Sequence, residues 1–294
     1  GCQIDSSDGH LPLAVRGPIQ PSGSVHIDGS LSSQYITALL LISCGVAGDQ
    51  AFFEKITIDG ELVSKPYIDI TITEMSKRGV SARWEGTRSI SIDTTRSYEA
   101  SHITIEGDAT AASYAASLAC IHRGQVKFTN LGSKTHQGDY RFFEVLERLG
   151  AVVTRDQTST LISGPSQLAH FKSIDMQDMP DVALTLIALG PLLNEELTIS
   201  GLSSLHHKEC DRLECPADEM LEMGIGVTTT SDSIRIQPAS VEELRDHLLT
   251  TYHDHRMAMA FSVLGSKTGL ITIDDKNVVD KTYPDYWKDY QKFL

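Results

Sequence analysis

The stretch Pro180-Asp181-Val182-Ala183-Leu184-Thr185-Leu186-Ile187-Ala188-Leu189 decides the fold, because its pattern returns at regular intervals along the chain. A small or polar start runs into an apolar segment, which predicts the beginning of a helix. The same pattern opens at Gly107-Asp108-Ala109-Thr110 and at His253-Asp254-His255-Arg256. Asp108, Asp181 and Asp254 are thereby equally spaced, and such a regularity indicates an internal repeat.

Each copy of the repeat continues in the same way. A second helix is predicted to end just before Gly79, Gly150 and Gly224, and glycine is favoured immediately past a helix end. Two short alternating runs follow each glycine and predict paired strands. With a fourth copy that opens at Asp28-Gly29-Ser30, the sequence predicts an α/β (α+β) fold built from repeated βαβαββ units.

The domain organisation follows from the repeat. One such unit cannot bury both faces of its helices and sheet, so several units must share a core. A chain of 294 residues also exceeds the roughly 100–200 residues of a typical domain. We therefore expect two lobes, residues 1–105 as the remainder of an N-terminal lobe and residues 106–294 as a C-terminal lobe. The chain opens without Met and in the middle of a unit, so we expect it to be incomplete.

Composition excludes several classes of function. A net charge of −14 disfavours a nucleic-acid surface, which needs clustered Lys and Arg. No apolar run approaches the roughly 20 residues of a membrane span. The five cysteines are odd in number and lack CxxC spacing, which argues against a disulfide framework and a zinc site. These features predict a cytoplasmic protein.

Helix starts are the candidate sites for anions. Asp28-Gly29-Ser30-Leu31-Ser32-Ser33-Gln34 places hydroxyls and an amide at the positive end of a helix, which suits a phosphate ester. The same residues also fit an ordinary N-cap. Asp181 has the same two interpretations, as a simple cap or as a group that faces a cleft together with His255 and Arg256.

Two charged segments are further candidates. Lys208 and Arg212 are four residues apart, on one face if the segment is helical, with Glu209 beside them. Such a cluster is also typical of a solvated helix face. The segment His253–Met259 turns from charged to wholly apolar, which predicts a charged end at the mouth of a buried helix. The histidines here and at His206-His207 lack a third nearby ligand, so no metal site is predicted.

Taken together, these motifs resemble those of the enolpyruvyl transferases, and within them the 5-enolpyruvylshikimate-3-phosphate synthases. The resemblance runs from about Leu11 to the end of the chain. It rests on Asp28–Gln34, Leu62–Asp69, Gly107–Ala109, Gln137–Asp139, Pro180-Asp181, Lys208–Arg212, Asp254–Met259 and Lys281–Tyr286. The resemblance implies a two-lobed fold with substrates between the lobes, of which about four of six units are present.

The resemblance also implies an activity. It is the transfer of the enolpyruvyl group of phosphoenolpyruvate to the 5-hydroxyl of shikimate 3-phosphate, which releases phosphate and serves chorismate and aromatic amino acid biosynthesis. The implied partners are these two small molecules, without nucleic acid or membrane, and the full-length form is expected to be a monomer. No metal or organic cofactor is implied.

Site residues are implied by the same match. The positions that match the shikimate 3-phosphate contacts are Ser32, Ser33, Gln34, Ser64, Tyr67, Asp181, Ser204 and Lys208. The positions that match the phosphoenolpyruvate contacts are Gln34, Arg212, His255, Arg256 and Lys281. Asp181 would accept the proton of the attacking hydroxyl, and Glu209 would protonate the methylene carbon. Ser204 departs from the family pattern, which commonly has Asn there.

The resemblance leaves alternatives open. In the family, further substrate-binding segments lie upstream of the position matched by Gly1, so we expect this chain alone to be inactive. A transferase for another acceptor, such as a UDP-sugar, is one alternative, against which Ser64-Lys65-Pro66-Tyr67 argues. A non-catalytic remnant that binds a ligand or a partner is the other, and the presence of Asp181, Glu209, Arg256 and Lys281 argues against it.

Overall fold

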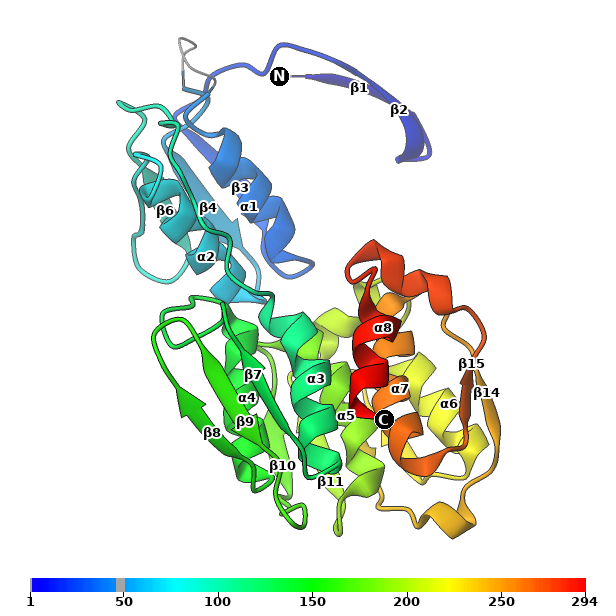
Figure 1. The fold of residues 1–294 in the computed structure, drawn as a ribbon. Coiled ribbons are helices and arrows are strands. Elements are labelled where there is room, and N and C mark those ends of the chain that lie inside the picture. Colours follow the sequence, from blue (N-terminus) through cyan, green and yellow to red (C-terminus); the bar gives the residue numbers. More distant parts are fainter. Residues whose placement is uncertain (1, 46–50) are drawn as a thin grey trace. The chain divides into compact units, whose positions relative to one another are not determined.

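A computed structural model describes residues 2–45 and 51–294, which form two compact units, Gly1–Ile103 and Thr104–Leu294 (Figure 1). The boundary expected from the sequence lies between residues 105 and 106. Each unit has its own hydrophobic core, because each buries a separate set of apolar side chains. Ile36 and Ile58 belong to the core of the smaller unit, and Phe143 and Phe261 to that of the larger.

The smaller unit contains one complete copy of the repeat. Its elements are β3 (Ser24–Asp28), α1 (Ser33–Ile42), β4 (Lys55–Asp59), α2 (Lys65–Ser76), β5 (Ala82–Trp84) and β6 (Ser89–Ile92). The sheet has the order β3-β4-β6-β5, in which β3 and β4 are parallel and the other pairs antiparallel. Since β3 and β4 run in the same direction and each leads into a helix, the starts of α1 and α2 lie at one edge of the sheet.

A hairpin precedes this copy. It consists of β1 (Gln3–Ser7) and β2 (His10–Arg16), which pair antiparallel. Asp8 and Gly9 form its turn with φ values of 55° and 77°, as expected for an Asp-Gly hairpin turn. All residues of both strands are exposed, including the apolar Ile4 and Val15. The two strands expected at the end of a repeat unit are thus present at the start of the chain.

The larger unit begins with a helix pair over a sheet of order β7-β9-β8. Its first elements are α3 (Ala109–Ile121), β7 (Gln125–Phe128), the 3-10 helix η1 (Gly138–Arg141), α4 (Phe142–Arg148), β8 (Val152–Arg155) and β9 (Thr160–Ser163). This part has the pattern αβαββ, so it lacks the first strand of the predicted unit.

A second complete copy of the repeat follows. Its elements are β10 (Ser173–Asp175), η2 (Pro180–Val182), α5 (Ala183–Leu189), η3 (Gly190–Leu192), β11 (Leu197–Ser200), η4 (Ser203–His207), α6 (Glu214–Met223), β12 (Val227–Thr229) and β13 (Ser233–Ile236). The sheet order β10-β11-β13-β12 and its strand directions repeat those of β3-β4-β6-β5. The predicted βαβαββ unit is therefore confirmed for these two copies.

The last copy closes the chain. Its elements are η5 (Val241–Glu243), β14 (His247–Leu249), α7 (His255–Thr268), β15 (Ile271–Ile273), η6 (Lys276–Lys281), α8 (Tyr286–Tyr290) and η7 (Gln291–Phe293). β14 and β15 are parallel, as the first two strands of a unit should be. The glycines predicted to end helices are also confirmed, because Gly79, Gly150 and Gly224 all have positive φ values.

The equivalent helices α3, α5 and α7 form the centre of the larger unit (Figure 1). Every residue of α5 is buried. Ser113 on α3 lies 3.0 Å from Thr185 on α5, and His122 at the C-cap of α3 lies 2.8 Å from Ser266 on α7, measured between side-chain polar atoms. The shared core expected from the repeat is therefore formed by helices from three successive copies.

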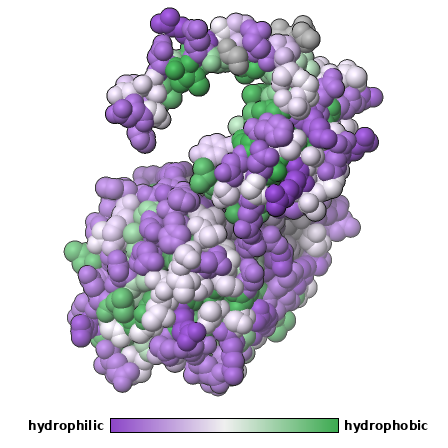
Figure 2. All heavy atoms as spheres, turned by 180° about the vertical axis from the view of Figure 1, so that it is seen from behind, coloured by the Kyte–Doolittle hydropathy of each residue, from purple (hydrophilic) through white to green (hydrophobic). Residues whose placement is uncertain are grey.

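The surface of the larger unit is mostly polar. Figure 2 shows polar atoms over most of its visible face, with apolar atoms in small scattered groups. Among the helices that the structure describes, none is both long and apolar enough to cross a bilayer.

Candidate functional site

Asp181 is the centre of a charged cluster at the start of α5. Its carboxylate lies 3.2 Å from Lys208 Nζ, 3.4 Å from Arg212 Nη1 and 3.2 Å from Arg256 Nη2. The three cations come from two different copies of the repeat. Packing of the copies in the larger unit therefore assembles this cluster.

Glu209 forms the second part of the cluster. Its Oε2 atom lies 2.7 Å from Arg212 Nη2, and its Oε1 atom accepts a short hydrogen bond from Lys281 Nζ at the end of η6. The Glu209 side chain is 29% exposed and that of Lys281 is 53% exposed, so this pair is accessible to solvent. Arg212 connects the two carboxylates because it contacts both Asp181 and Glu209.

Asp254 holds Arg212 in place. This carboxylate is fully buried and accepts hydrogen bonds from Arg212 Nε at 2.7 Å and Nη2 at 3.1 Å. It also caps α7 by accepting the Arg256 backbone N–H at 2.8 Å. Arg212 is itself only 2% exposed, so its charge is stabilised by the surrounding carboxylates rather than by water.

The cations keep both candidate catalytic carboxyls ionised. Burial favours the neutral form of Asp181, but Arg256, Lys208 and Arg212 outweigh it and hold the pKa of its carboxyl well below the usual range. Burial likewise opposes ionisation of Glu209, while Lys281 and Arg212 lower its pKa to about 2. Both groups are thus carboxylates at neutral pH in this structure.

His255 adds a neutral group next to the cations. Burial, supported by the charge of Arg256, lowers the pKa of His255 to about 4. Both ring nitrogens of His255 are buried without a hydrogen-bond partner among the described residues, and the buried hydroxyl of Tyr114 lies beside Arg256. Because an unpaired buried polar atom is costly, these atoms favour the binding of a polar ligand at this position.

Two local expectations from the sequence differ from the structure. The segment from Lys208 to Arg212 is not helical, because η4 ends at His207 and bends and turns follow until α6 begins. Lys208 and Arg212 meet at Asp181 rather than along a helix face. The simple cap interpretation of Asp181 is also not what the structure gives, because the N-cap residues of η2 and α5 are Met179 and Val182.

The smaller unit holds the other predicted residues at its two helix starts. Ser32 caps α1, and its Oγ accepts the Gln34 backbone N–H at 3.2 Å. Ser33 is buried, whereas Gln34 is exposed. Ser64 precedes α2 in the left-handed conformation, with φ of 54° and no side-chain cap bond, and Tyr67 lies in the first turn. The capping interpretation therefore applies to Ser32.

The loops that carry these residues are tied together. The Gly29 backbone N–H donates to the Asp59 carbonyl at 2.9 Å, and the Val63 N–H donates to the Gly29 carbonyl at 3.2 Å. A Cβ at Gly29 would lie 2.6 Å from the Ile58 side chain, so glycine is required for this close approach. The starts of α1 and α2 thus form one group of hydroxyls within the smaller unit.

The remaining predicted residue and histidines lie near the charged cluster. Ser204 is buried in η4. His206 Nδ1 lies 2.7 Å from the carboxylate of Asp211, which in turn accepts backbone N–H groups at the start of α6. Within residues 2–45 and 51–294, no group of three or more His, Cys, Asp or Glu side chains is arranged to hold a metal ion.

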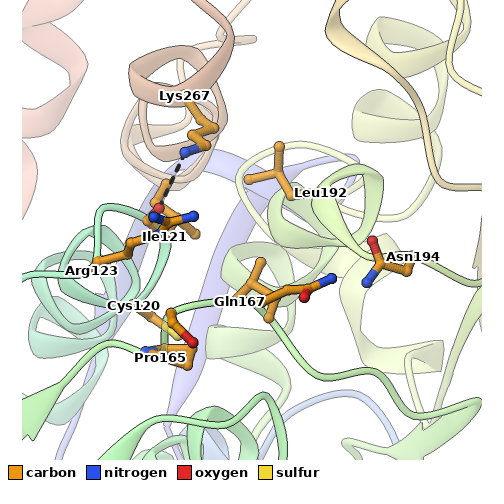
Figure 3. A pocket seen from close by; sticks show the side chains of 10 residues that line it. Cys120, Ile121, Arg123, Pro165, Gln167, Leu192, Asn194 and Lys267 are labelled. Atoms are coloured by element: carbon orange, nitrogen blue, oxygen red, sulfur yellow. Dashed lines mark hydrogen bonds between the residues drawn. The ribbon is translucent and has the colours of Figure 1, made fainter.

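A separate pocket of about 180 Å³ lies where α3 and α7 end (Figure 3). Its walls include Arg123, Gln167, Asn194 and Lys267. Lys267 donates to the Ile121 carbonyl at 3.4 Å, as the dashed line in Figure 3 shows. Cations at helix C-termini offset the negative end of the helix dipole, so these charges have a structural explanation.

The sequence of this chain matches one known family along nearly all of its length. The family is described as EPSP synthase (3-phosphoshikimate 1-carboxyvinyltransferase), and the match covers residues 1–290. The chain belongs to the EPSP synthase family. Its similarity to the 3-phosphoshikimate 1-carboxyvinyltransferase of Idiomarina loihiensis is 35% identity over 97% of this chain, and to that of Mannheimia haemolytica 36% over 99%.

The chain spans 65% and 66% of the length of these two relatives. Solved structures agree with the family assignment at the level of the fold. The alignment with the EPSP synthase of Acinetobacter baumannii covers 99% of this chain and 67% of the A. baumannii chain, with a TM-score of 0.74 and 21% identity. The enolpyruvyl transferase NikO of Streptomyces tendae covers 99% and 68%, with a TM-score of 0.69 and 13% identity. The predicted α/β fold of the enolpyruvyl transferases is thus confirmed.

Two members of the charged cluster were not assigned a role from the sequence. Asp254 was recognised only as part of a motif, although its equal spacing with Asp108 and Asp181 was visible. Tyr114 was not recognised at all. Its position in α3 gave no signal, because an aromatic residue in an apolar helix is typical of an ordinary core.

Proposed function

We propose that this chain takes part in transferring the enolpyruvyl group of phosphoenolpyruvate to the 5-hydroxyl of shikimate 3-phosphate, with release of phosphate. The observation that carries the proposal is the pair of carboxylates, Asp181 and Glu209, which share Arg212 and are each bound to further cations. The reaction needs one group to take a proton from oxygen and another to deliver one to carbon.

Phosphoenolpyruvate suits the cations of the cluster. Its carboxylate and phosphate match the bidentate geometry of guanidinium groups, which Arg212 and Arg256 supply. Lys281 adds a third, more exposed cation, and Gln34 and His255 would line the same ligand. In the structure, the carboxylates of Asp181 and Glu209 form ion pairs with these cations.

Ligand binding would therefore change the protonation of the two carboxyls. When an anionic ligand takes the cations, Glu209 loses part of the interaction that lowers its pKa to about 2. Its burial then acts with less opposition and raises the pKa. This brings Glu209 closer to the pH at which it carries the proton that the reaction needs.

The chemical steps balance with these two groups alone. The oxygen of the 5-hydroxyl bonds to C2 of phosphoenolpyruvate while Asp181 takes the proton of that hydroxyl. At the same time Glu209 gives a proton to C3, which becomes a methyl group. The product of this addition is a tetrahedral ketal. In the elimination, Glu209 removes a methyl proton, the C2–O bond to phosphate breaks, and the leaving phosphate takes the proton from Asp181.

Shikimate 3-phosphate would be held by the neutral and positively charged groups. The hydroxyls of Ser32, Ser33, Ser64 and Tyr67 and the backbone N–H groups at the start of α1 suit its ester phosphate. Lys208, Ser204 and Asp181 would contact its ring hydroxyls. In this proposal the smaller unit is the remainder of the N-terminal lobe, the larger unit is the C-terminal lobe, and the enzyme works as a cytoplasmic monomer.

The test measures phosphate release from the two substrates in two formats. The first uses this chain alone. The second adds, as a separate polypeptide, the part of a relative that this chain does not match. Binding of each substrate to the chain is measured in parallel by calorimetry. Asp181→Asn and Glu209→Gln are each expected to lower turnover by about 100-fold or more, and Asp108→Asn is the matched control outside the cluster. No turnover in either format, together with no binding of either substrate, would contradict the proposal.

The acceptor is tested in the same assay. Replacing shikimate 3-phosphate by UDP-N-acetylglucosamine is expected to give no phosphate release. Release with the UDP-sugar and not with shikimate 3-phosphate would favour the alternative acceptor class.

A further inference from the structure

The segment that leads into α7 contains a strained turn. Tyr252 and His253 both have left-handed backbone conformations, with φ values of 51° and 58°, and the Asp254 N–H donates to the Thr251 carbonyl at 2.8 Å. Two successive left-handed residues are typical of a type I′ turn, which favours Asn-Gly. Tyr and His are unfavourable there, so surrounding contacts must hold the turn.

Glu219 on α6 supplies these contacts. Its carboxylate is 3% exposed and lies 2.8 Å from the Tyr252 hydroxyl, 3.0 Å from the Thr250 backbone N–H and 2.6 Å from His247 Nε2. On the other side of the turn, the Thr251 N–H donates to the Asp274 carboxylate at 3.1 Å. A buried carboxylate is tolerated only when it is fully hydrogen-bonded, and this set of donors meets that condition.

The carboxylate of Glu219 has no part in the reaction proposed above. Its hydrogen-bond partners are His247, Thr250 and Tyr252, and it belongs to no metal-binding group among the described residues. What it holds is the backbone immediately before Asp254, His255 and Arg256. Its effect on the cluster therefore has to pass through the turn.

Helix α6 is attached to this segment at two points. Arg212 lies just before α6 and binds Asp254, and Glu219 lies within α6 and binds Tyr252. Asp211 fixes the start of the helix by accepting the Leu213 and Glu214 N–H groups. The Tyr252-His253 turn and the first turn of α7 are thus both positioned by one rigid element.

We propose that Glu219 is a positioning residue, whose carboxylate keeps the Tyr252-His253 turn left-handed and thereby sets His255 and Arg256 in the charged cluster. What those two side chains bind rests on the proposed function. The positioning itself does not, since it follows from contacts within the larger unit. The two are therefore tested by separate measurements.

The first measurement uses the full chain without ligand. In Glu219→Gln, amide hydrogen exchange of a peptide that covers residues 250–257 is expected to be about tenfold faster, because a charged acceptor of the turn is lost. Peptides of α3 are the internal control. The NMR titration of His255 is expected to move up from about pH 4 by roughly one pH unit, as its ring becomes more solvated. The titration of His122, at the C-cap of α3, should stay unchanged.

A second substitution that restores the left-handed turn tests whether Glu219 acts on the charged cluster through that turn. His253 is exposed, and His253→Gly supplies the residue that a left-handed position favours. In the Glu219→Gln background, His253→Gly is expected to restore slow exchange and the low His255 titration. Unchanged exchange and titration in Glu219→Gln, or a defect that His253→Gly does not reduce, would overturn the proposal.

Two further experiments address the case in which Glu219→Gln does not fold and the link between Glu219 and the proposed function. Tyr252→Phe removes only the hydroxyl that contacts Glu219, so it tests the same contact if Glu219→Gln does not fold, with the same expected direction. Phosphoenolpyruvate affinity is then measured for all variants, with a loss of about tenfold expected in Glu219→Gln and recovery in the double variant. If the unmodified chain binds neither substrate and shows no turnover in either format, the proposed function is contradicted, while the exchange and titration results still decide the role of Glu219.

Discussion

The starts of α3 and α7 occupy equivalent positions in the repeat, yet only one of them belongs to the charged cluster. Asp108 caps α3 by accepting the Thr110 and Ala111 N–H groups, and Asp254 caps α7 in the same way through Arg256. Asp108 is exposed, whereas Asp254 is fully buried and also binds Arg212. Capping is therefore shared by these two copies of the repeat, and the cluster arises where a buried guanidinium is added to the cap.

Asp181 shows a third outcome at the same repeat position. It stands before α5 in the 3-10 helix η2, and its carboxylate contacts Lys208, Arg212 and Arg256. The three equivalent aspartates thus have different surroundings. Substitution of each one separates the cost of losing a cap from the cost of losing a counter-ion.

The largest effect on stability is expected for Asp254→Asn. Asparagine still caps a helix, but it leaves Arg212 as a buried charge without its main partner, which costs about 3–5 kcal/mol. Asp108→Asn is the matched control and is expected to change the free energy of unfolding by less than about 0.5 kcal/mol. Urea unfolding followed by circular dichroism measures both.

Equal destabilisation by Asp254→Asn and Asp108→Asn would contradict the role of Asp254 as the main counter-ion of Arg212. Adding Arg212→Met to Asp254→Asn sharpens the comparison. The double variant is expected to recover part of the lost stability, because it removes the buried charge itself.

The next effect is on turnover. If turnover is obtained with the second polypeptide, Asp181→Asn is expected to lower kcat by about 100-fold or more, as for loss of a general base. The KM for phosphoenolpyruvate should not rise, because the asparagine no longer competes with the ligand for Arg256 and Arg212. A rise in KM with unchanged kcat would instead assign Asp181 to binding.

Acid should weaken the larger unit through Glu209. Its pKa is lowered from 4.5 to about 2 in the folded chain, so its stabilising contribution is complete above pH 4.5 and is lost as pH falls towards 2. The difference in urea midpoint between the unmodified chain and Glu209→Gln should therefore shrink from pH 5 to pH 2.5. A difference that stays constant over this range would contradict the ion pairs of Glu209 with Arg212 and Lys281.

The smallest effect is expected at the start of α3. Asp108→Ala removes a cap that serves only backbone N–H groups, so the loss should be about 1 kcal/mol. Thermal unfolding measures it against Asp108→Asn, which retains capping ability. A loss as large as that of Asp254→Asn would mean that Asp108 has a partner beyond the helix end.

Much of the fold could be predicted from the sequence because it depends on local patterns. The repeat, the helix starts at Asp108 and Asp254, and the glycines after helices follow from periodicity and from the backbone preferences of single residues. The family motifs could also be recognised from the sequence, because each is a short run of neighbouring residues. The predicted roles of the matching residues remain proposals.

Other features were decided only by the tertiary structure. From the sequence, Lys208 and Arg212 would share a face only if their segment were helical. Instead a non-helical segment brings both cations to Asp181, and Asp254 supplies the buried partner of Arg212. The contacts of Glu219 with Tyr252 and Thr250 gave no sequence signal. These contacts join residues far apart in the chain, so they depend on how α5, α6 and α7 pack, whereas periodicity and capping report only on the nearest few residues.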